Sequence, residues 1–430
     1  MFCLFPAITM SLGWGLRGFI GGGPLGAMIP GALVAMALSM LLGRDASSSG
    51  LIAAFGAIGI GFGGEMTYGQ TVGFIIKPET YAWGLAGLTL KGAVWGLLGG
   101  AVLGTALVER RFTRTRIAMA LASIIAGTYA GWKWINQPKL LYFSDPVNKP
   151  RAEIWAGLLL GALLFLACLR LAGDARIPAG FALAGFIGGG IGFGLGGTLM
   201  TLGMHQPYLQ RWNPWWKIME MVFGFCLGLG LGMFAWRRRQ ELAAGEPVEA
   251  AARAPRIWLL IGGAAVVVVD LFLVESNVKL RYSYVVAGVL VLAALQVVRS
   301  LTWQLAVTAT YCFAAIDSVN YYSRVRKLGD PTVGWGLAIA TSLLLASLLA
   351  LRQRQAKPLL RWSYLWLTWA CVAISWIKLL LHPDPVIGVP VEIAFTLAAL
   401  LLTWISAGTR AGRALVGAAA ACLSIPGRWP

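Results

Sequence analysis

The sequence carries very little charge and almost no histidine. Of its 430 residues, 12% are charged and only two are histidines. A soluble domain carries about 25% charged residues. Because 58% of the residues are hydrophobic, a chain of this length has too little polar surface to cover a water-soluble core. The composition therefore excludes an ordinary soluble protein and indicates a membrane protein.

Several catalytic signatures are also missing from the sequence. It contains no GxxxxGK[ST] phosphate loop, no HExxH and no GxSxG, which argues against an ATP-driven machine, a zinc hydrolase and a serine hydrolase of the elbow type. Its six cysteines are widely spaced and form no CxxC pair. This spacing argues against a disulfide framework or a zinc cluster. We expect neither a cofactor nor a metal site.

Long apolar stretches recur along the whole chain. Each has about 17–25 residues and is long enough to cross a hydrocarbon layer of about 30 Å as a helix. The sequence therefore predicts an all-α polytopic integral membrane protein with about fourteen transmembrane helices. The predicted spans lie near 2–20, 24–43, 51–74, 82–108, 117–135, 154–172, 179–203, 214–236, 257–274, 283–298, 302–318, 332–350, 362–381 and 389–407.

The basic residues suggest how the chain is oriented. The formal net charge is +18, but the Arg and Lys residues are dispersed among the short segments between spans, which favours contact with lipid headgroups over binding of nucleic acid. With residue 1 in the cytoplasm, the inner segments carry the larger share of Arg and Lys, including the runs at 109–116 and 237–239. We therefore expect both termini in the cytoplasm, and a bacterial cytoplasmic membrane as the location.

Glycine divides the chain into two unlike parts. Of the 55 glycines, 43 fall before residue 245. We therefore predict a Gly-rich domain of eight spans at 1–236, a cytoplasmic linker at 237–256, and a six-span membrane domain at 257–430. The linker is polar and Ala-rich.

The Gly-rich part shows signs of a tandem repeat. Triplets of glycines at a spacing of four, each followed by two arginines, recur at one constant offset, which predicts parallel units of four spans at about 1–111 and 112–239. The hexapeptide GFIGGG occurs at 18–23 and 185–190, which do not correspond, and this counts against the repeat. The triplets are Gly96, Gly100 and Gly104, and Gly224, Gly228 and Gly232.

These glycines have two expected roles. A glycine at every fourth position lets another helix backbone approach closely, so we interpret the triplets as packing surfaces. The denser clusters at 13–24 and 61–65 should weaken regular helix. Unpaired backbone groups at membrane depth are tolerated where they are buried in protein or line a wet cavity. These clusters could therefore either form a solute site or serve tight packing.

Ionisable residues inside spans are the candidate site residues. Each costs about 2.5–3.5 kcal/mol to insert and usually faces the bundle interior with a partner. We predict a polar cavity in the outer half of the bilayer that binds a substrate, with neutral hydrogen-bonding groups beside it; a structural network of salt bridges is the alternative. Its residues are Arg17, Glu65, Tyr68, Gln70, Lys91 and Glu220. A second polar cluster could join Asp270, Asp317 and Asn320, again with a structural alternative.

Three classes of function fit these observations. The leading hypothesis is a secondary transporter or channel-like carrier of a small polar solute, which could be anionic. A membrane-embedded enzyme acting on a lipid-linked or periplasmic substrate is the second, with Glu65 or Glu220 as general base. A non-catalytic subunit of a membrane complex is the third. The expected partners are the lipid bilayer, a small polar solute, and a second membrane protein or another copy of the chain.

Overall fold

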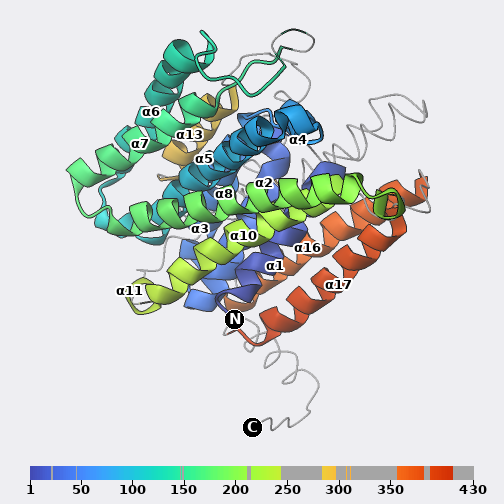
Figure 1. Cartoon of the computed structure of the whole chain (residues 1–430). Helices are drawn as coiled ribbons and strands as arrows, with labels where there is room; N and C mark the ends of the chain where they lie inside the picture. The colour runs from blue at the N-terminus through green and yellow to red at the C-terminus, as the bar shows by residue number, and fades with distance from the viewer. Residues whose placement is uncertain are drawn as a thin grey trace, which may run out of the picture.

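The computed structural model describes residues 1–20, 23–44, 46–145, 147, 150–210, 215–243, 283–296, 307, 310, 356–381 and 388–409. Within these ranges the chain forms helices and no strands (Figure 1). The helices are α1 (Leu4–Ile20), α2 (Gly23–Leu42), α3 (Ala46–Phe62), α4 (Gly69–Ile75), α5 (Tyr81–Leu107), α6 (Arg114–Gly131), α7 (Trp155–Ala172), α8 (Arg176–Met204), α9 (Pro207–Gln210), α10 (Trp215–Arg237), α11 (Arg239–Ala243), α13 (Ser283–Leu295), α16 (Ala356–Leu381) and α17 (Gly388–Ala407). Short 3-10 turns lie at Gly63–Glu65, Pro78–Thr80 and Glu109–Arg111, and a π turn at Trp132–Asn136.

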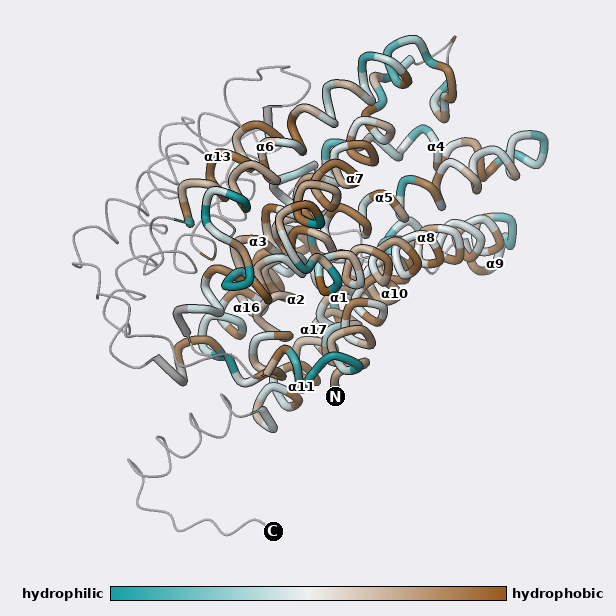
Figure 2. Tube along the Cα trace, turned by 90° about the vertical axis from the view of Figure 1, so that its left-hand side faces the viewer, coloured by the Kyte–Doolittle hydropathy of each residue, from teal (hydrophilic) through white to brown (hydrophobic). Residues whose placement is uncertain are grey.

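Several of these helices are those of a multi-pass membrane protein. Five of them, α5 with its preceding turn, α7, α8, α10 and α17, are long and apolar enough to cross a membrane. These helices are mostly hydrophobic along their length, and hydrophilic residues gather at turns such as those near α4 and α11 (Figure 2). The helices predicted at these five places are confirmed. The predicted spans at 257–274 and 332–350, and all of 302–318 except residues 307 and 310, lie outside the described residues.

Six helices form a closed ring of packing partners. In order, α1, α2, α3, α5, α8 and α10 each pack against the next, and α10 packs back against α1. The pair α6 and α7 lies outside this ring, with α7 against α5, and α13 packs on α6 and α3. Helices α16 and α17 pack against α1. The described helices after the predicted linker thus pack directly on the Gly-rich helices.

Glycines line the contacts around this ring. A Cβ atom added to Gly96 on α5 would overlap the carbonyl oxygen of Gly185 on α8, and one added to Gly228 on α10 would overlap the carbonyl oxygen of Pro6 on α1. The helix backbones therefore touch, as the fourfold glycine spacing predicts. Contacts of this kind replace the hydrophobic driving force that is missing between helices in lipid.

The third predicted span, 51–74, is broken. Helix α3 ends at Phe62, a 3-10 turn follows at Gly63–Glu65, and α4 begins at Gly69. The two helical parts of this segment are bent by 61°. The turn needs glycine because a Cβ on Gly63 would collide with the ring of Trp95, and one on Gly64 with the backbone of Pro24. The glycine cluster thus ends the helix beside the centre of the ring.

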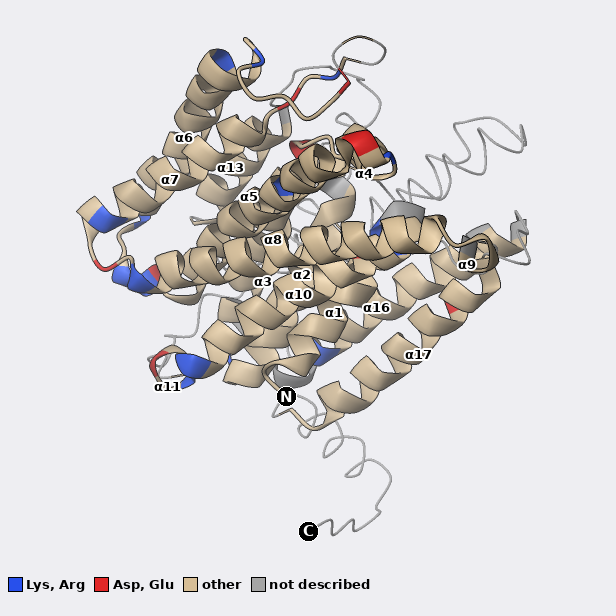
Figure 3. Cartoon of the chain, in the orientation of Figure 1, with Lys and Arg blue, Asp and Glu red and all other residues tan. Residues whose placement is uncertain are grey.

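Arginines gather at one end of the bundle (Figure 3). This basic end comprises the last turns of α2, α5, α7 and α10, the first turns of α3, α6 and α8, and α11. Contacts tie these turns together: Arg44 donates to the carbonyl of Leu107, Arg116 donates to the carbonyl of Ala172, and Arg111 pairs with Glu241. The arginines at this end are Arg44, Arg110, Arg111, Arg114, Arg116, Arg170, Arg176, Arg237, Arg238 and Arg239.

Candidate functional site

Lys91, near the middle of α5, is buried and fully engaged. Its Nζ atom lies 2.7 Å from Oε1 of Glu153, and both side chains are 1% exposed. The same ammonium donates to the backbone oxygen of Thr67 at 2.7 Å and to the hydroxyl of Thr71 at 2.8 Å. An ammonium group has three protons to donate, so each has an acceptor.

The partner carboxylate is held just as completely. Glu153 lies just before α7, where its carboxylate accepts hydrogen bonds from the backbone N–H of Phe143 and the hydroxyl of Ser144. Thr71 in turn donates to the carbonyl of Phe143. The Lys91 network therefore joins α4, α5 and the segment before α7, and its arrangement is that of a structural ion pair.

Glu65 contacts a different part of the molecule. Its carboxylate accepts hydrogen bonds from the backbone N–H groups of Tyr284 and Val285 in the first turn of α13. The first N–H groups of a helix have no partner inside the helix, and a carboxylate there also complements the helix dipole. Glu65 thus caps α13. Neither Arg17 nor Lys91 forms an ion pair with it.

Glu220 on α10 is buried and also has several partners. Its carboxylate accepts a hydrogen bond from the hydroxyl of Tyr68 at 2.8 Å and one from the indole of Trp216 at 3.2 Å. Lys217, one turn earlier, pairs with its second oxygen at 2.8 Å. These contacts neutralise Glu220 and fix the Tyr68 hydroxyl.

Arg17, at the end of α1, is different from all of these groups. Its side chain is 4% exposed, yet its Nε and Nη1 atoms have no hydrogen-bond partner among the described residues. Three aromatic rings surround the guanidinium: its Cζ atom lies 5.3 Å from the ring centre of Trp95, 5.5 Å from that of Trp14 and 5.8 Å from that of Tyr68. We call Arg17 and these three rings the Arg17 site.

The Arg17 site lies at the centre of the helix ring. Trp14 packs edge-on against Trp95 at 5.1 Å and against Phe223 at 4.6 Å, and Phe223 stacks on Phe193 at 3.8 Å between ring centres. These side chains come from α1, α5, α8 and α10. The surroundings of the guanidinium are thus apolar, and electrostatic interactions are stronger there than in water.

Tyr68 connects the Arg17 site to the surface. Its ring faces the guanidinium on one side and stacks on Trp216 on the other, at 5.9 Å between ring centres. Trp216 is 38% exposed, whereas Tyr68 is 9% exposed. Arg17 itself is covered, with 4% exposure.

The predicted site residues therefore separate into three places. Arg17, Tyr68 and Glu220 lie together, Lys91 pairs with Glu153, and Glu65 caps α13. Gln70 is partly buried, and its Oε1 atom accepts no hydrogen bond from the described residues. Asp270, Asp317 and Asn320 lie outside the described residues. No group of three His, Cys, Asp or Glu side chains that could hold a metal occurs in the described part of the chain.

Three residues of these networks had not been singled out from the sequence as site residues. Trp14 and Trp95 were not distinguished from the other tryptophans of the chain, although Trp14 precedes Arg17 by one helical turn. Glu153 lies 62 positions from Lys91. Its position just before the predicted span 154–172 gives no sign of this pairing.

Comparison of the chain with protein-family models, with curated proteins and with solved structures finds no match. What the chain does has to be inferred from the chemistry of the site itself.

Proposed function

We propose that the chain is a secondary transporter or channel-like carrier of a small anionic solute, which binds through Arg17. One observation carries the proposal: a guanidinium is buried at the centre of a helix ring, and two of its nitrogens lack a hydrogen-bond partner among the described residues. A carboxylate is the simplest group that would complete it, because its two oxygens match the planar fork of an arginine.

The three aromatic rings offset much of the free-energy cost of burying Arg17 without a charged partner. A buried charge whose partner is absent costs about 3–5 kcal/mol. Cation–π contacts with an aromatic ring return about 0.5–2 kcal/mol each. The three rings thus make the lone cation tolerable between binding events, while the donors that they leave unpaired keep it ready for an anion.

The surroundings supply a way in and a counter-charge. Tyr68 separates the exposed Trp216 from Arg17, so displacement of one ring would admit a solute. Glu220 would repel an anion if it were alone, but Lys217 pairs with it. We take Tyr68 as the residue that a solute must displace and Trp216 as the outer edge of its route.

The proposed orientation puts the basic end in the cytoplasm, because short cytoplasmic loops carry an excess of Arg and Lys. Helix α1 starts at that end, where Phe2 lies against Gly232, and Arg17 is near its far end. The Arg17 site then belongs to the outer half of the bilayer, which suits uptake from outside the cell.

The test is uptake by purified protein reconstituted in lipid vesicles. A set of radiolabelled carboxylates (acetate, lactate, succinate and glutamate) would be offered with and without a proton or sodium gradient. We expect saturable uptake of at least one of them, lost in Arg17→Met and kept in Arg114→Met, an exposed arginine of the basic end.

Other outcomes of the same assay point to the other functions. Chemical conversion of the solute without accumulation would favour a membrane-embedded enzyme. If vesicles neither accumulate nor convert any of these anions, the carrier proposal fails and a subunit of a membrane complex becomes the better account.

A further inference from the structure

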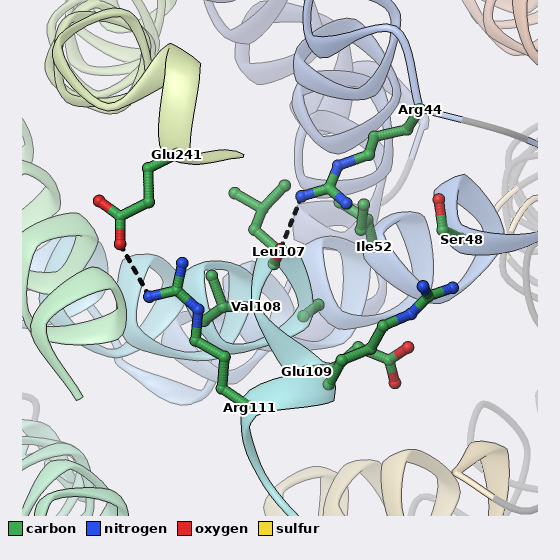
Figure 4. Close-up of a pocket in the computed structure, with 10 residues that line it drawn as sticks. Arg44, Ser48, Ile52, Leu107, Val108, Glu109, Arg111 and Glu241 are labelled. Atoms are coloured by element: carbon green, nitrogen blue, oxygen red, sulfur yellow. Dashed lines mark hydrogen bonds and ion pairs between the residues drawn. The ribbon is translucent and has the colours of Figure 1, made fainter. Parts of the chain in front are cut away.

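A second polar site lies at the basic end, where α1 starts, whereas Arg17 lies in the last turn of that helix. A pocket of about 270 Å³ opens there between the ends of α2, α3, α5 and α11. One ordered water needs only about 10–15 Å³. Three arginines line the pocket, namely Arg44, Arg110 and Arg111, together with Ser48 in the first turn of α3. Figure 4 shows Arg44, Arg111 and Ser48 around the opening.

Contacts hold Arg44 and Arg111 in place. Arg44 donates from Nη2 to the carbonyl of Leu107 at 2.8 Å, and Nη1 of Arg111 lies 2.8 Å from the carboxylate of Glu241 (Figure 4). Arg111 also faces Asp174 at 3.8 Å. A guanidinium has five N–H donors, and both ion pairs of Arg111 involve Nη1, so its Nε and Nη2 can donate to a ligand.

The balance of charge at the pocket favours an anion. The lining has three arginines and two carboxylates, Glu109 and Glu241. Glu241 is shared by Arg111 and by Arg238, whose Nη1 lies 3.6 Å away. Asp174 is held mainly by Arg176. With three arginines and two carboxylates, the lining of the pocket keeps a formal charge of +1.

We propose that this pocket binds a phosphoryl group. A phosphoryl group offers several oxygens and one to two negative charges, which suits arginines that approach from different helices better than a single carboxylate would. Ser48 adds a hydroxyl. The first turn of α3 adds N–H groups and the positive end of its dipole, which favour anions.

Two sources could supply the phosphoryl group. The pocket also has an apolar wall, which includes Ile52 and Val108, and it lies where membrane helices end. Basic pockets between membrane helices at this level bind phospholipid headgroups. An anionic phospholipid would place its glycerol and first methylenes on this wall, whereas free phosphate would use the arginines alone.

The experiment measures the thermal stabilisation of the full chain in detergent. The ligands are dioctanoyl phosphatidylglycerol, inorganic phosphate, and dioctanoylglycerol, which lacks the phosphoryl group. We expect a saturable rise in melting temperature with phosphatidylglycerol and none with dioctanoylglycerol. A rise with inorganic phosphate would support the same site with the free anion as its ligand.

Variants then locate the binding. The double variant Arg110→Gln with Arg111→Gln should weaken the apparent Kd at least about tenfold, because charge-assisted hydrogen bonds are lost. Ser48→Ala should weaken it about threefold to tenfold, and serves as the test if the double variant does not fold. Arg114→Gln removes a charge from the same end but not from the pocket, and should bind like the wild type.

Two results would overturn the proposal. One is a wild-type chain that is stabilised by neither phosphoryl ligand. The other is an equal loss of affinity in Arg114→Gln and in the pocket variants, which would mean that general charge at this end, and not the pocket, attracts the ligand.

Discussion

Lys91 and Arg17 are two buried cations in one ring of helices, and the chain treats them in opposite ways. Lys91 has an acceptor for each of its protons, including a carboxylate that is itself fully bonded. Arg17 has aromatic faces around it and two nitrogens without a hydrogen-bond partner among the described residues. Both residues sit inside α-helices, at 1% and 4% exposure.

The difference separates scaffold from site. Where all the donors of a buried cation have acceptors, replacing that residue can only lower the stability of the protein. A cation that is left short of partners already costs the resting protein whatever part of the free energy of burial its aromatic neighbours do not offset, and replacing the cation removes that cost. Stability and activity should therefore respond in opposite directions at these two positions.

The largest effect is expected at the satisfied cation. Lys91→Met leaves Glu153 charged and buried, and should lower the free energy of unfolding by about 3–5 kcal/mol. The measurement is thermal or denaturant unfolding of the purified protein in detergent.

The matched control for Lys91 removes the other charge as well. Lys91→Met combined with Glu153→Gln should recover more than half of the loss, because no buried charge is then left without a partner. The amide oxygen can still accept the hydrogen bond from the backbone N–H of Phe143, and the amide NH2 can donate to the hydroxyl of Ser144. A double variant as unstable as the single one would mean that packing, and not the ion pair, sets the contribution of Lys91.

The second effect should appear in uptake and not in stability. Arg17→Met keeps an apolar side chain of similar length among the rings, so we expect a melting temperature equal to that of the wild type or higher. Uptake of the anionic solute should fall at least about tenfold, the worth of one lost charge-assisted hydrogen bond. A loss of stability comparable to that of Lys91→Met would break the comparison and make Arg17 part of the scaffold.

A smaller effect is expected at Tyr68. Tyr68→Phe keeps the ring between Arg17 and Trp216 but removes the hydrogen bond to Glu220. We expect a loss of about 1 kcal/mol in the free energy of unfolding, and faster uptake at saturating solute because the ring is released more easily. Unchanged uptake kinetics together with unchanged solute affinity would show that this ring does not control access.

The smallest effect is expected at an exposed ion pair. Hydrogen bonds from Arg176 lower the pKa of Asp174 from 3.8 to about 2. Because the folded-state pKa is depressed, the pair contributes fully above about pH 4, and its contribution is lost as the pH falls toward 2. Exposed pairs contribute little, so Asp174→Asn should leave the melting temperature at pH 7 almost unchanged. A drop as large as that of Lys91→Met would remove the distinction between buried and exposed pairs.

The apolar runs predict much of the fold. Spans expected at 154–172 and 214–236 match α7 at Trp155–Ala172 and α10 at Trp215–Arg237. A single apolar segment can satisfy all of its own backbone hydrogen bonds in lipid only as a helix. The break after Phe62 was not placed within the predicted span 51–74, because glycine density shows that a helix is weak but not where a neighbouring side chain makes it end. The tandem repeat and the division into two domains stay predictions.

The sequence predicts several residues of the candidate site but not which of them contact one another. Insertion cost marks Arg17, Glu65, Lys91 and Glu220 from the sequence alone, but which carboxylate reaches which cation depends on tertiary structure. Glu153 reaches Lys91 because the segment before α7 folds back over α4 and α5, and no periodicity encodes such a segment. The sequence does not mark Trp216 as a site residue, whereas in the structure its indole donates to Glu220.

The glycine contacts of the helix ring have a consequence for how the protein tolerates substitution. In an ordinary core, harm grows with the volume that is added or removed. At Gly96 and Gly185, each of which lies against the other's carbonyl oxygen, the first carbon of any side chain already meets backbone that cannot swing aside. Alanine should then be almost as damaging there as leucine, whereas at Gly288, which faces the ring of Phe62, damage should rise with size. In a saturation mutagenesis scan of the chain, the contacts of the helix ring would therefore appear as glycine positions where every substitution is about equally damaging, whatever the size of the new side chain.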